Sequence, residues 1–354
     1  MRQLFGTDGM RGVAGEPPLD TRTTFAAGVA LGRWIGSNHL DPEVVIGMDT
    51  RESGTWIAEY VAGGLASTGA RARFAGLITT PGVAHVTRTG PFAAGVMISA
   101  SHNPYQDNGV KILGHSGFKL PDEQEHALEL DMFAWLESGA APVRKPLEVD
   151  EGLDRAYVDH LGSTLPLGLA GIELVVDTAN GAATYLAPAL FERLGAKVDC
   201  IGCAPDGRNI NLNCGSLHLE SLRERVLATR ASLGVAFDGD ADRALFVSHS
   251  GKIVDGDAVM LLCALPLHRS GHLTVVRQGT TAGGGIRTRS QARDRRSGGK
   301  ISNRVAQLTG QREVLVLVDR PGLFDALPGR EGGDHRFDDL LGSRRAGDDP
   351  DGAR

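Results

Sequence analysis

Three aspartates at alternating positions give the strongest chemical signal in the chain. The acidic motif consists of Asp238, Asp240 and Asp242, within the sequence DGDADR. It follows the short apolar run 233–237, and in an extended segment residues two apart point to the same side, so we expect the carboxylates to converge. The small residues between them allow the backbone to bend around an ion. Three hard oxygen ligands predict a divalent cation site, with Mg²⁺ as the expected ion.

The same spacing also opens the calcium-binding loop of EF-hand proteins. That loop needs Gly at its sixth position and Glu at its twelfth, where this sequence has Arg243 and His249. A calcium-sensor loop is therefore excluded. A solvated acidic turn is the remaining alternative, and the adjacent arginine favours the metal site over it. Taken alone, the motif predicts a divalent metal and no particular reaction.

A second candidate site is the polar segment SASHNP at 99–104, which follows the apolar run 95–98. Open α/β sheets bind ligands at the carboxyl ends of their strands, where this segment begins. Ser101 is the candidate nucleophile, and His102 and Lys111 could handle a proton and phosphate charge. The composition is also that of an ordinary turn, so residue types leave both interpretations open. No serine-hydrolase elbow and no glycine-rich nucleotide loop follows a strand.

Strands and helices are both expected to position these side chains. Short apolar runs, typical of strands, alternate along the chain with segments of helical spacing. The pairs are 43–48 with 55–65, 94–98 with 122–136, 173–176 with 184–194, and 197–201 with 219–233. This alternation predicts α/β domains with mainly parallel sheets.

The length of 354 residues predicts two to three domains. The segment 138–149 is rich in small residues, contains Pro and has no periodicity, so we expect a domain boundary there, and a second near 255–257. The expected divisions are 1–145, 150–254, 255–276 and 277–354.

Composition excludes several classes of protein. The net charge of -6 gives no basic surface for nucleic acid, and no apolar run is long enough to span a membrane. The first residues, MRQLFGTD, lack the apolar region of a signal peptide, so we expect a cytoplasmic location. Cys200 and Cys203 form a C-x-x-C without a second ligand pair at zinc spacing, so we expect all four cysteines to be reduced core or loop residues.

Other conspicuous residues receive structural interpretations. Trp34, Trp56 and Trp135 lie on amphipathic helical patterns and are expected in the core. The segment Thr79-Thr80-Pro81 is expected to be a helix cap followed by proline in the first turn.

Three segments together resemble the signature sequences of the α-D-phosphohexomutase family. They are FGTDGMRG at 5–12, SASHNP with DNGVK at 99–111, and DGDADR at 238–243. Within the family, three further stretches are similar to the phosphoglucosamine mutase branch: VDTANGA at 176–182, PDGRNIN at 205–211 and CGS at 214–216. The resemblance covers residues 1 to about 270 and implies tandem mixed α/β domains, with two complete, the third partial and the fourth absent.

The resemblance implies a role for each matched residue. Ser101 would carry a phosphoryl group and, through it, share a Mg²⁺ ion with the three aspartates. Four further residues would line this centre: Arg11, His102, Lys111 and Arg243. The arginines and the lysine would stabilise the phosphate oxygens, and either the histidine or the lysine would relay the hydroxyl proton.

The implied reaction interconverts glucosamine 6-phosphate and glucosamine 1-phosphate, in the synthesis of amino-sugar nucleotides and cell-wall precursors. The phosphoserine would form a bound 1,6-bisphosphate, and after the sugar turns over, the other phosphoryl group would return to Ser101. The expected partner is a phosphorylated hexosamine, with no nucleic acid and no membrane, and a homodimer is compatible with the sequence. A phosphomannomutase or phosphoglucomutase is an alternative with the same chemistry.

The resemblance ends in the C-terminal part of the chain. The family's sugar-recognition motif G-E-x-S-G-H and its phosphate-gripping motif R-x-S-G-T-E-P do not occur. The last 78 residues contain 14 arginines, against 17 in the preceding 276, and only 313–318 has the pattern of a strand. We therefore expect disorder over most of 277–354, from a shifted reading frame or a divergent tail. An inactive metal-binding remnant of the enzyme is the corresponding alternative function.

Overall fold

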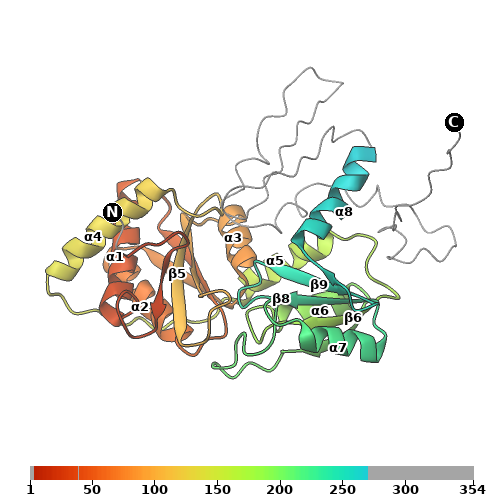
Figure 1. Cartoon of the computed structure of the whole chain (residues 1–354). Helices are drawn as coiled ribbons and strands as arrows, with labels where there is room; N and C mark the ends of the chain where they lie inside the picture. Colours follow the sequence, from red (N-terminus) through yellow and green to blue (C-terminus); the bar gives the residue numbers. More distant parts are fainter. Residues whose placement is uncertain (1–3, 39, 270–354) are drawn as a thin grey trace, which may run out of the picture.

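A computed structural model describes residues 4–38 and 40–269 of the chain (Figure 1). This part contains two five-stranded sheets, which follow one another along the sequence. The strand orders are β1-β5-β4-β2-β3 and β10-β9-β8-β6-β7. The predicted tail at 277–354 and its strand at 313–318 lie outside the described residues.

The first sheet and its helices are formed by residues up to 137. Their bounds are β1 Met10–Val13, α1 Thr21–Ser37, β2 Glu43–Met48, α2 Gly54–Ser67, β3 Arg71–Leu77, α3 Thr80–Thr89, β4 Ala94–Ile98, β5 Asp107–Gly114 and α4 Asp122–Glu137.

The second sheet and the remaining helices follow. Their bounds are α5 Glu151–Ser163, β6 Glu173–Asp177, α6 Leu186–Arg193, β7 Lys197–Ile201, α7 Glu220–Thr229, β8 Leu233–Phe237, β9 Ala244–Ser248, β10 Ile253–Val254 and α8 Gly256–Arg269.

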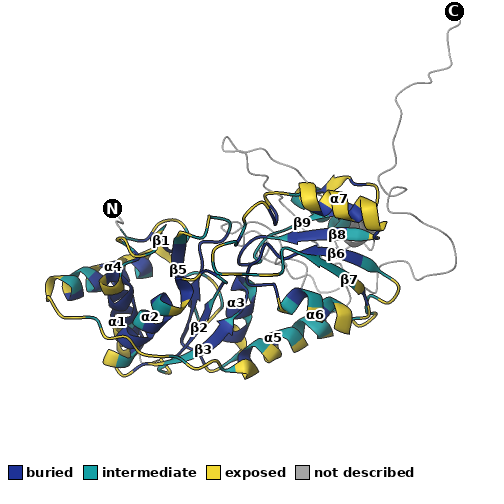
Figure 2. Ribbon diagram, turned by 90° about the horizontal axis from the view of Figure 1, so that it is seen from below, coloured by how far each residue is buried: buried dark blue, intermediate teal, exposed yellow. Residues whose placement is uncertain are grey.

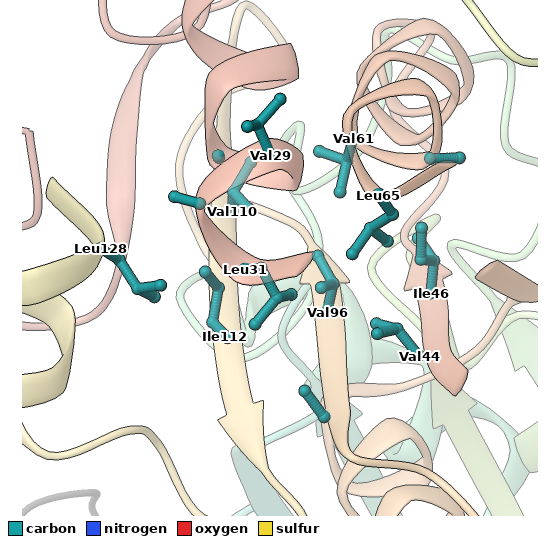
Figure 3. Close-up of a cluster of buried hydrophobic side chains, with 14 of the residues drawn as sticks. Val29, Leu31, Val44, Ile46, Val61, Leu65, Val96, Val110, Ile112 and Leu128 are labelled. Carbon is teal, nitrogen blue, oxygen red and sulfur yellow. The ribbon is translucent and has the colours of Figure 1, made fainter. Parts of the chain in front are cut away.

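Each sheet buries both of its faces, because successive side chains of a strand point to opposite sides. In β2, Val44 and Ile46 pack with α1, α2 and α4, whereas Val45 packs with α3 and α5. Figure 3 shows the first of these clusters, in which Leu65 of α2 lies beside Ile46 and Leu31 of α1 lies beside Val96 of β4. Each such side chain is almost fully buried and contributes about 1.5–3 kcal/mol.

The second sheet repeats the arrangement on a smaller scale. Leu174 and Val176 of β6 pack with Ala187 of α6. Val175, between them, packs on the other face with Leu222 of α7. Figure 2 shows α5 between the two sheets, where it packs against α3 and β3 on one side and α6 on the other. The domain boundaries at 138–149 and 255–257 remain predictions.

The predicted parallel pairing holds for three neighbouring strands of each sheet, and the mixed character of the sheets comes from one reversed strand in each, β5 and β9. In the first sheet β2 is parallel to β3 and β4, but β5 is antiparallel to both β1 and β4. In the second, β6 is parallel to β7 and β8, but β9 is antiparallel to β8 and β10. The reason lies in the two polar segments, since a connection of a few residues is too short for a parallel crossover. The short connections are the two loops that carry the candidate site residues, between β4 and β5 and between β8 and β9.

Two structural interpretations are confirmed, those of the tryptophans and of the helix cap. Trp135 is 9% exposed, its ring lies 4.9 Å from that of Phe25, and Trp34 and Trp56 pack against the same core. Thr79 caps α3 by accepting a 3.1 Å hydrogen bond from the backbone N–H of Gly82. All four cysteines are free thiols. Among the described helices, none has the length and apolar character needed to cross a membrane.

Candidate active site

The two polar loops meet between the sheets, although they are far apart in sequence. Ser101 lies in the loop after β4, and Asp238 begins the loop after β8. The Ser101 hydroxyl donates a 2.6 Å hydrogen bond to Asp238 Oδ2. Both loops leave the carboxyl ends of strands, as expected for ligand-binding positions of α/β sheets. The contact joins the two halves of the described chain into one site.

Ser101 is held in an unusual backbone conformation. Its φ of +54° is left-handed, a region that costs a residue with a side chain about 1–2 kcal/mol. The Ser101 backbone N–H donates to Ser99 Oγ at 2.9 Å, and Ser99 Oγ donates to Asp49 Oδ2 at 2.6 Å. This chain of bonds fixes a residue that is only 1% exposed. Strain of this kind is concentrated at functional sites.

The three aspartates converge as predicted. One carboxylate oxygen from each of Asp238, Asp240 and Asp242 lies within 4.8 Å of the others. The expected reason, an extended segment, is wrong, because the residues form a turn in which Ala241 has a φ of +53°. The turn brings the carboxylates together by bending the backbone instead of by strand periodicity.

The electrostatics of this cluster fit a divalent cation. Burial, together with the charges of Asp240 and Asp242, raises the pKa of Asp238 to about 7. Burial also disfavours the charge of Asp240, but Lys111 and Thr80 outweigh it and lower the pKa of that carboxyl. Among the described residues, the buried Asp240 Oδ1 has no hydrogen-bond partner. Clustered carboxylates with an unused buried oxygen form the donor set that Mg²⁺ prefers.

Lys111 is a buried cation beside the aspartates. It lies on β5, is 2% exposed, and its Nζ is 2.9 Å from Asp240 Oδ2 and 3.7 Å from Asp242 Oδ2. Burial alone would lower the pKa of Lys111, but these carboxylates and Asp8 raise it instead. The side chain therefore holds its proton and is suited to balancing anionic charge.

Arg243 connects the acidic loop with the serine loop. Its Nη2 lies 2.9 Å from Asp238 Oδ2, contacts Ser101 Oγ, and donates to His102 Nδ1 at 2.5 Å. Burial and the neighbouring charges of Arg243 and Arg11 lower the pKa of His102. The imidazole is consequently neutral near pH 7, with Nδ1 accepting. Ser101 Oγ is 3.4 Å from the same ring nitrogen.

Arg11 completes the set of predicted residues from β1. Its Nη2 donates to Asp8 Oδ2 at 2.5 Å, and the same carboxylate oxygen is 3.3 Å from Lys111 Nζ. Within residues 4–38 and 40–269, the buried Arg11 Nε has no hydrogen-bond partner. The structure thus brings together every residue that the sequence predicted for the site.

The sequence did not predict several residues that contact the site residues and hold them in place. Thr80 Oγ1 donates to Asp240 Oδ2 at 2.6 Å, and its backbone N–H donates to the Asp240 carbonyl at 2.9 Å. The helix-cap interpretation of this segment was correct for Thr79 and incomplete for Thr80. Asp49 and Arg51, which form a buried ion pair at 3.0 Å, were also missed. Their position directly after the run 43–48, at the carboxyl end of a strand, was the available signal.

A candidate nucleophilic serine on one α/β sheet, facing a carboxylate cluster on the next, is typical of a two-domain phosphoryl-transfer enzyme. The family models that match the chain agree with this class. Residues 2–138 match the model of phosphoglucomutase/phosphomannomutase, alpha/beta/alpha domain I, and residues 155–251 match that of domain II. The chain belongs to the phosphoglucomutase/phosphomannomutase family. The resemblance to the α-D-phosphohexomutases is therefore confirmed.

The curated relatives of the chain point to one branch of this family. The chain is 59% identical over 272 residues to a phosphoglucosamine mutase of Solibacter usitatus, covering 77% of this chain and 61% of the relative. It is 46% identical over 283 residues to one of Koribacter versatilis, with the same coverage. The chain thus spans about three fifths of the length of these relatives.

Solved structures agree on the fold. A putative phosphomannomutase from Thermus thermophilus superimposes with a TM-score of 0.66 and 28% identity, over 76% of this chain and 62% of that one. A family protein from Burkholderia thailandensis gives a TM-score of 0.64 and 26% identity, over 76% and 60%.

Proposed function

We propose that this chain carries the phosphoserine half of a phosphoglucosamine mutase, which interconverts glucosamine 6-phosphate and glucosamine 1-phosphate. The observation that carries the proposal is the 2.6 Å contact between Ser101 Oγ and Asp238, beside two further carboxylates. The 59% identical relative supports the choice of glucosamine phosphate as substrate. Phosphomannomutase and phosphoglucomutase activities share this chemistry and are separated by the assay below.

The residues of the chain divide the work of phosphoryl transfer. A hydroxyl oxygen of the sugar attacks the phosphorus of phosphorylated Ser101, and the bond from phosphorus to Oγ breaks. Neutral His102, whose Nδ1 lies 3.4 Å from Oγ, relays the hydroxyl proton to Oγ, so that the leaving oxygen becomes the Ser101 hydroxyl again. Arg243, already in contact with Oγ, stabilises the leaving oxygen, and Lys111 and Arg11 balance the charge of the phosphate oxygens. The return step uses the same atoms in reverse.

Mg²⁺ is the cation proposed for Asp238, Asp240 and Asp242, with the phosphate on Ser101 as a further ligand. When bound, it would supply positive charge that offsets the charge of the group in transfer. Lys111 and Thr80 hold Asp240 in place through contacts of 2.9 and 2.6 Å. The cytoplasmic location expected from the sequence stays a prediction.

The proposal is tested by incubating the chain with glucosamine 6-phosphate, Mg²⁺ and a 1,6-bisphosphate primer. We expect formation of glucosamine 1-phosphate, abolished by Ser101→Ala and retained by Ser163→Ala, a matched change at an exposed serine. Turnover that survives Ser101→Ala would refute the proposed nucleophile. Labelling of Ser101 without turnover would favour the remnant, and faster reaction of glucose 1-phosphate than of glucosamine 1-phosphate would favour a phosphoglucomutase.

A further inference from the structure

Two backbone carbonyls of the serine loop each accept hydrogen bonds from two side chains. Arg51 Nη2 donates to the carbonyl of Ser101 at 3.0 Å and to that of Asn103 at 2.9 Å. Asn211 Nδ2 donates to the same carbonyls at 2.9 and 3.1 Å. The carbonyl group of Ser101 is thus bound by two side chains. Arg51 lies in the loop after β2 of the first sheet, and Asn211 lies in the loop after β7 of the second.

Arg51 forms the half of this grip that belongs to the first sheet. Its side chain is fully buried and pairs with Asp49, which lies equally deep. Its second terminal nitrogen, Nη1, donates to the carbonyls of Pro104 and, at 2.9 Å, of Asp107. One guanidinium therefore donates to four carbonyls between Ser101 and Asp107.

Asn211 forms the other half and is anchored in the second sheet's own loops. Its backbone is left-handed, with a φ of +58°, and its N–H donates to the carbonyl of Ala179 at 2.9 Å. It belongs to the PDGRNIN stretch, to which the phosphoryl-transfer mechanism gives no role. The side chain reaches across the junction of the two halves to the serine loop.

The acidic loop is in close contact with the Ser101 carbonyl. A Cβ added to Gly239 would lie 2.4 Å from the Ser101 carbonyl oxygen and 2.9 Å from Asn211 Nδ2. The Ser101 carbonyl, the Asn211 amide and the Gly239 backbone are therefore in contact at one point. Any shift of the second sheet relative to the first would be transmitted directly to the peptide group of Ser101.

We infer that Arg51 and Asn211 are positioning residues that hold the Ser101 backbone in its left-handed conformation, with Asn211 coupling that conformation to docking of the two halves. The inference rests on the proposed function for its catalytic consequence. A nucleophile displaced by about 1 Å loses on the order of a hundredfold in rate, so a clamp on its peptide group controls transfer without touching substrate.

Asn211→Gly tests the clamp, because glycine adopts the left-handed backbone without strain and removes only the amide. The matched control is Asn213→Gly, in the same loop, where Asn213 is exposed and has a φ of +54°. The first measurement is hydrogen exchange of the Ser101 and Asn103 amides in the whole chain. These N–H groups donate to Ser99 Oγ and to the Ala100 carbonyl, so their exchange reports opening of the loop. Loss of the two bonds to the loop carbonyls should make that opening, and the exchange, about tenfold faster in Asn211→Gly than in the control.

The second measurement is the rate of Ser101 phosphorylation by radiolabelled glucose 1,6-bisphosphate. We expect a maximal rate about tenfold lower in Asn211→Gly, with an unchanged half-saturating bisphosphate concentration, and a normal rate in Asn213→Gly. Equal exchange in the two variants would overturn the clamp. Faster exchange with a normal phosphorylation rate would overturn its positioning role. If the unsubstituted chain takes no label, the proposed function fails, and exchange alone decides the clamp.

Discussion

Lowering the pH should weaken Mg²⁺ binding through a single carboxyl group. The pKa of Asp238 is raised to about 7 by burial and by the nearby charges of Asp240 and Asp242. A proton and a cation compete for this carboxylate, because metal ligands must be deprotonated. Affinity should therefore rise with pH up to about 7 and then become constant.

The size of the effect follows from that pKa. At pH 6, one unit lower, about one Asp238 side chain in ten is ionised, so the affinity should be about tenfold lower than at pH 8, or about 1.4 kcal/mol. The pKa of Asp238 in the folded chain lies above its unfolded value of 3.8. Its contribution to the stability of the metal-free fold is therefore fully present below pH 3.8. The stabilisation is lost as pH rises through 7. The increase in Tm caused by Mg²⁺ should consequently grow from pH 6 to pH 8.

Titration calorimetry at a series of pH values between 5.5 and 8.5 measures the affinity directly, with thermal unfolding at fixed Mg²⁺ as a second readout. Asp238→Asn should bind more weakly and lose the pH dependence. Asp154→Asn is the control, because burial also raises the pKa of Asp154, outside the site. Equal affinities of the unsubstituted chain at pH 6 and pH 8 would refute the assignment of the proton to Asp238.

Two further predictions concern the support of the site and the core. Thr80→Val removes the 2.6 Å bond to Asp240 and should weaken Mg²⁺ binding and lower the free energy of unfolding by about 1–2 kcal/mol, whereas the exposed Thr229→Val should change neither measurably. Gly28→Ala should cost about 1–3 kcal/mol or more in urea unfolding, because its Cβ would lie 2.1 Å from the Val61 carbonyl. Gly36→Ala, in open space on the same helix, should be neutral or stabilising, and equal effects would contradict the close packing of α1 on α2.

The sequence was informative where local chemistry and position coincide. Ser101 and Asp238 each follow an apolar run, and the end of a strand in an α/β sheet is a ligand-binding position whatever the order of the strands. Their meeting could therefore be predicted, and the sheets proved to be mixed, with β5 and β9 running against their neighbours. Strand direction depends on the connection, and the loops after β4 and β8 are too short to allow a parallel return.

The supporting residues could not be found in the same way. Thr80 contacts Asp240 across 160 residues, and Asn211 reaches Ser101 across 110. Nothing in the local sequence of a threonine after a cap, or of an asparagine in a turn, indicates a partner so far away. These contacts exist only because the two sheets pack together in one orientation. For Arg51 the available signal was its position after the run 43–48, but an arginine in a polar segment is usually exposed, so its burial was not expected.

The division of the site between two sheets also sets an order of events during synthesis. Ser101 precedes Asp238 by 137 residues, so at about 5–20 residues per second the ribosome takes roughly 7 to 27 s to proceed from one to the other. Over that interval the nascent first domain displays its serine without the acid cluster. Ser101 therefore gains its contact with the Asp238 carboxylate only after the second sheet has been made and has packed against the first.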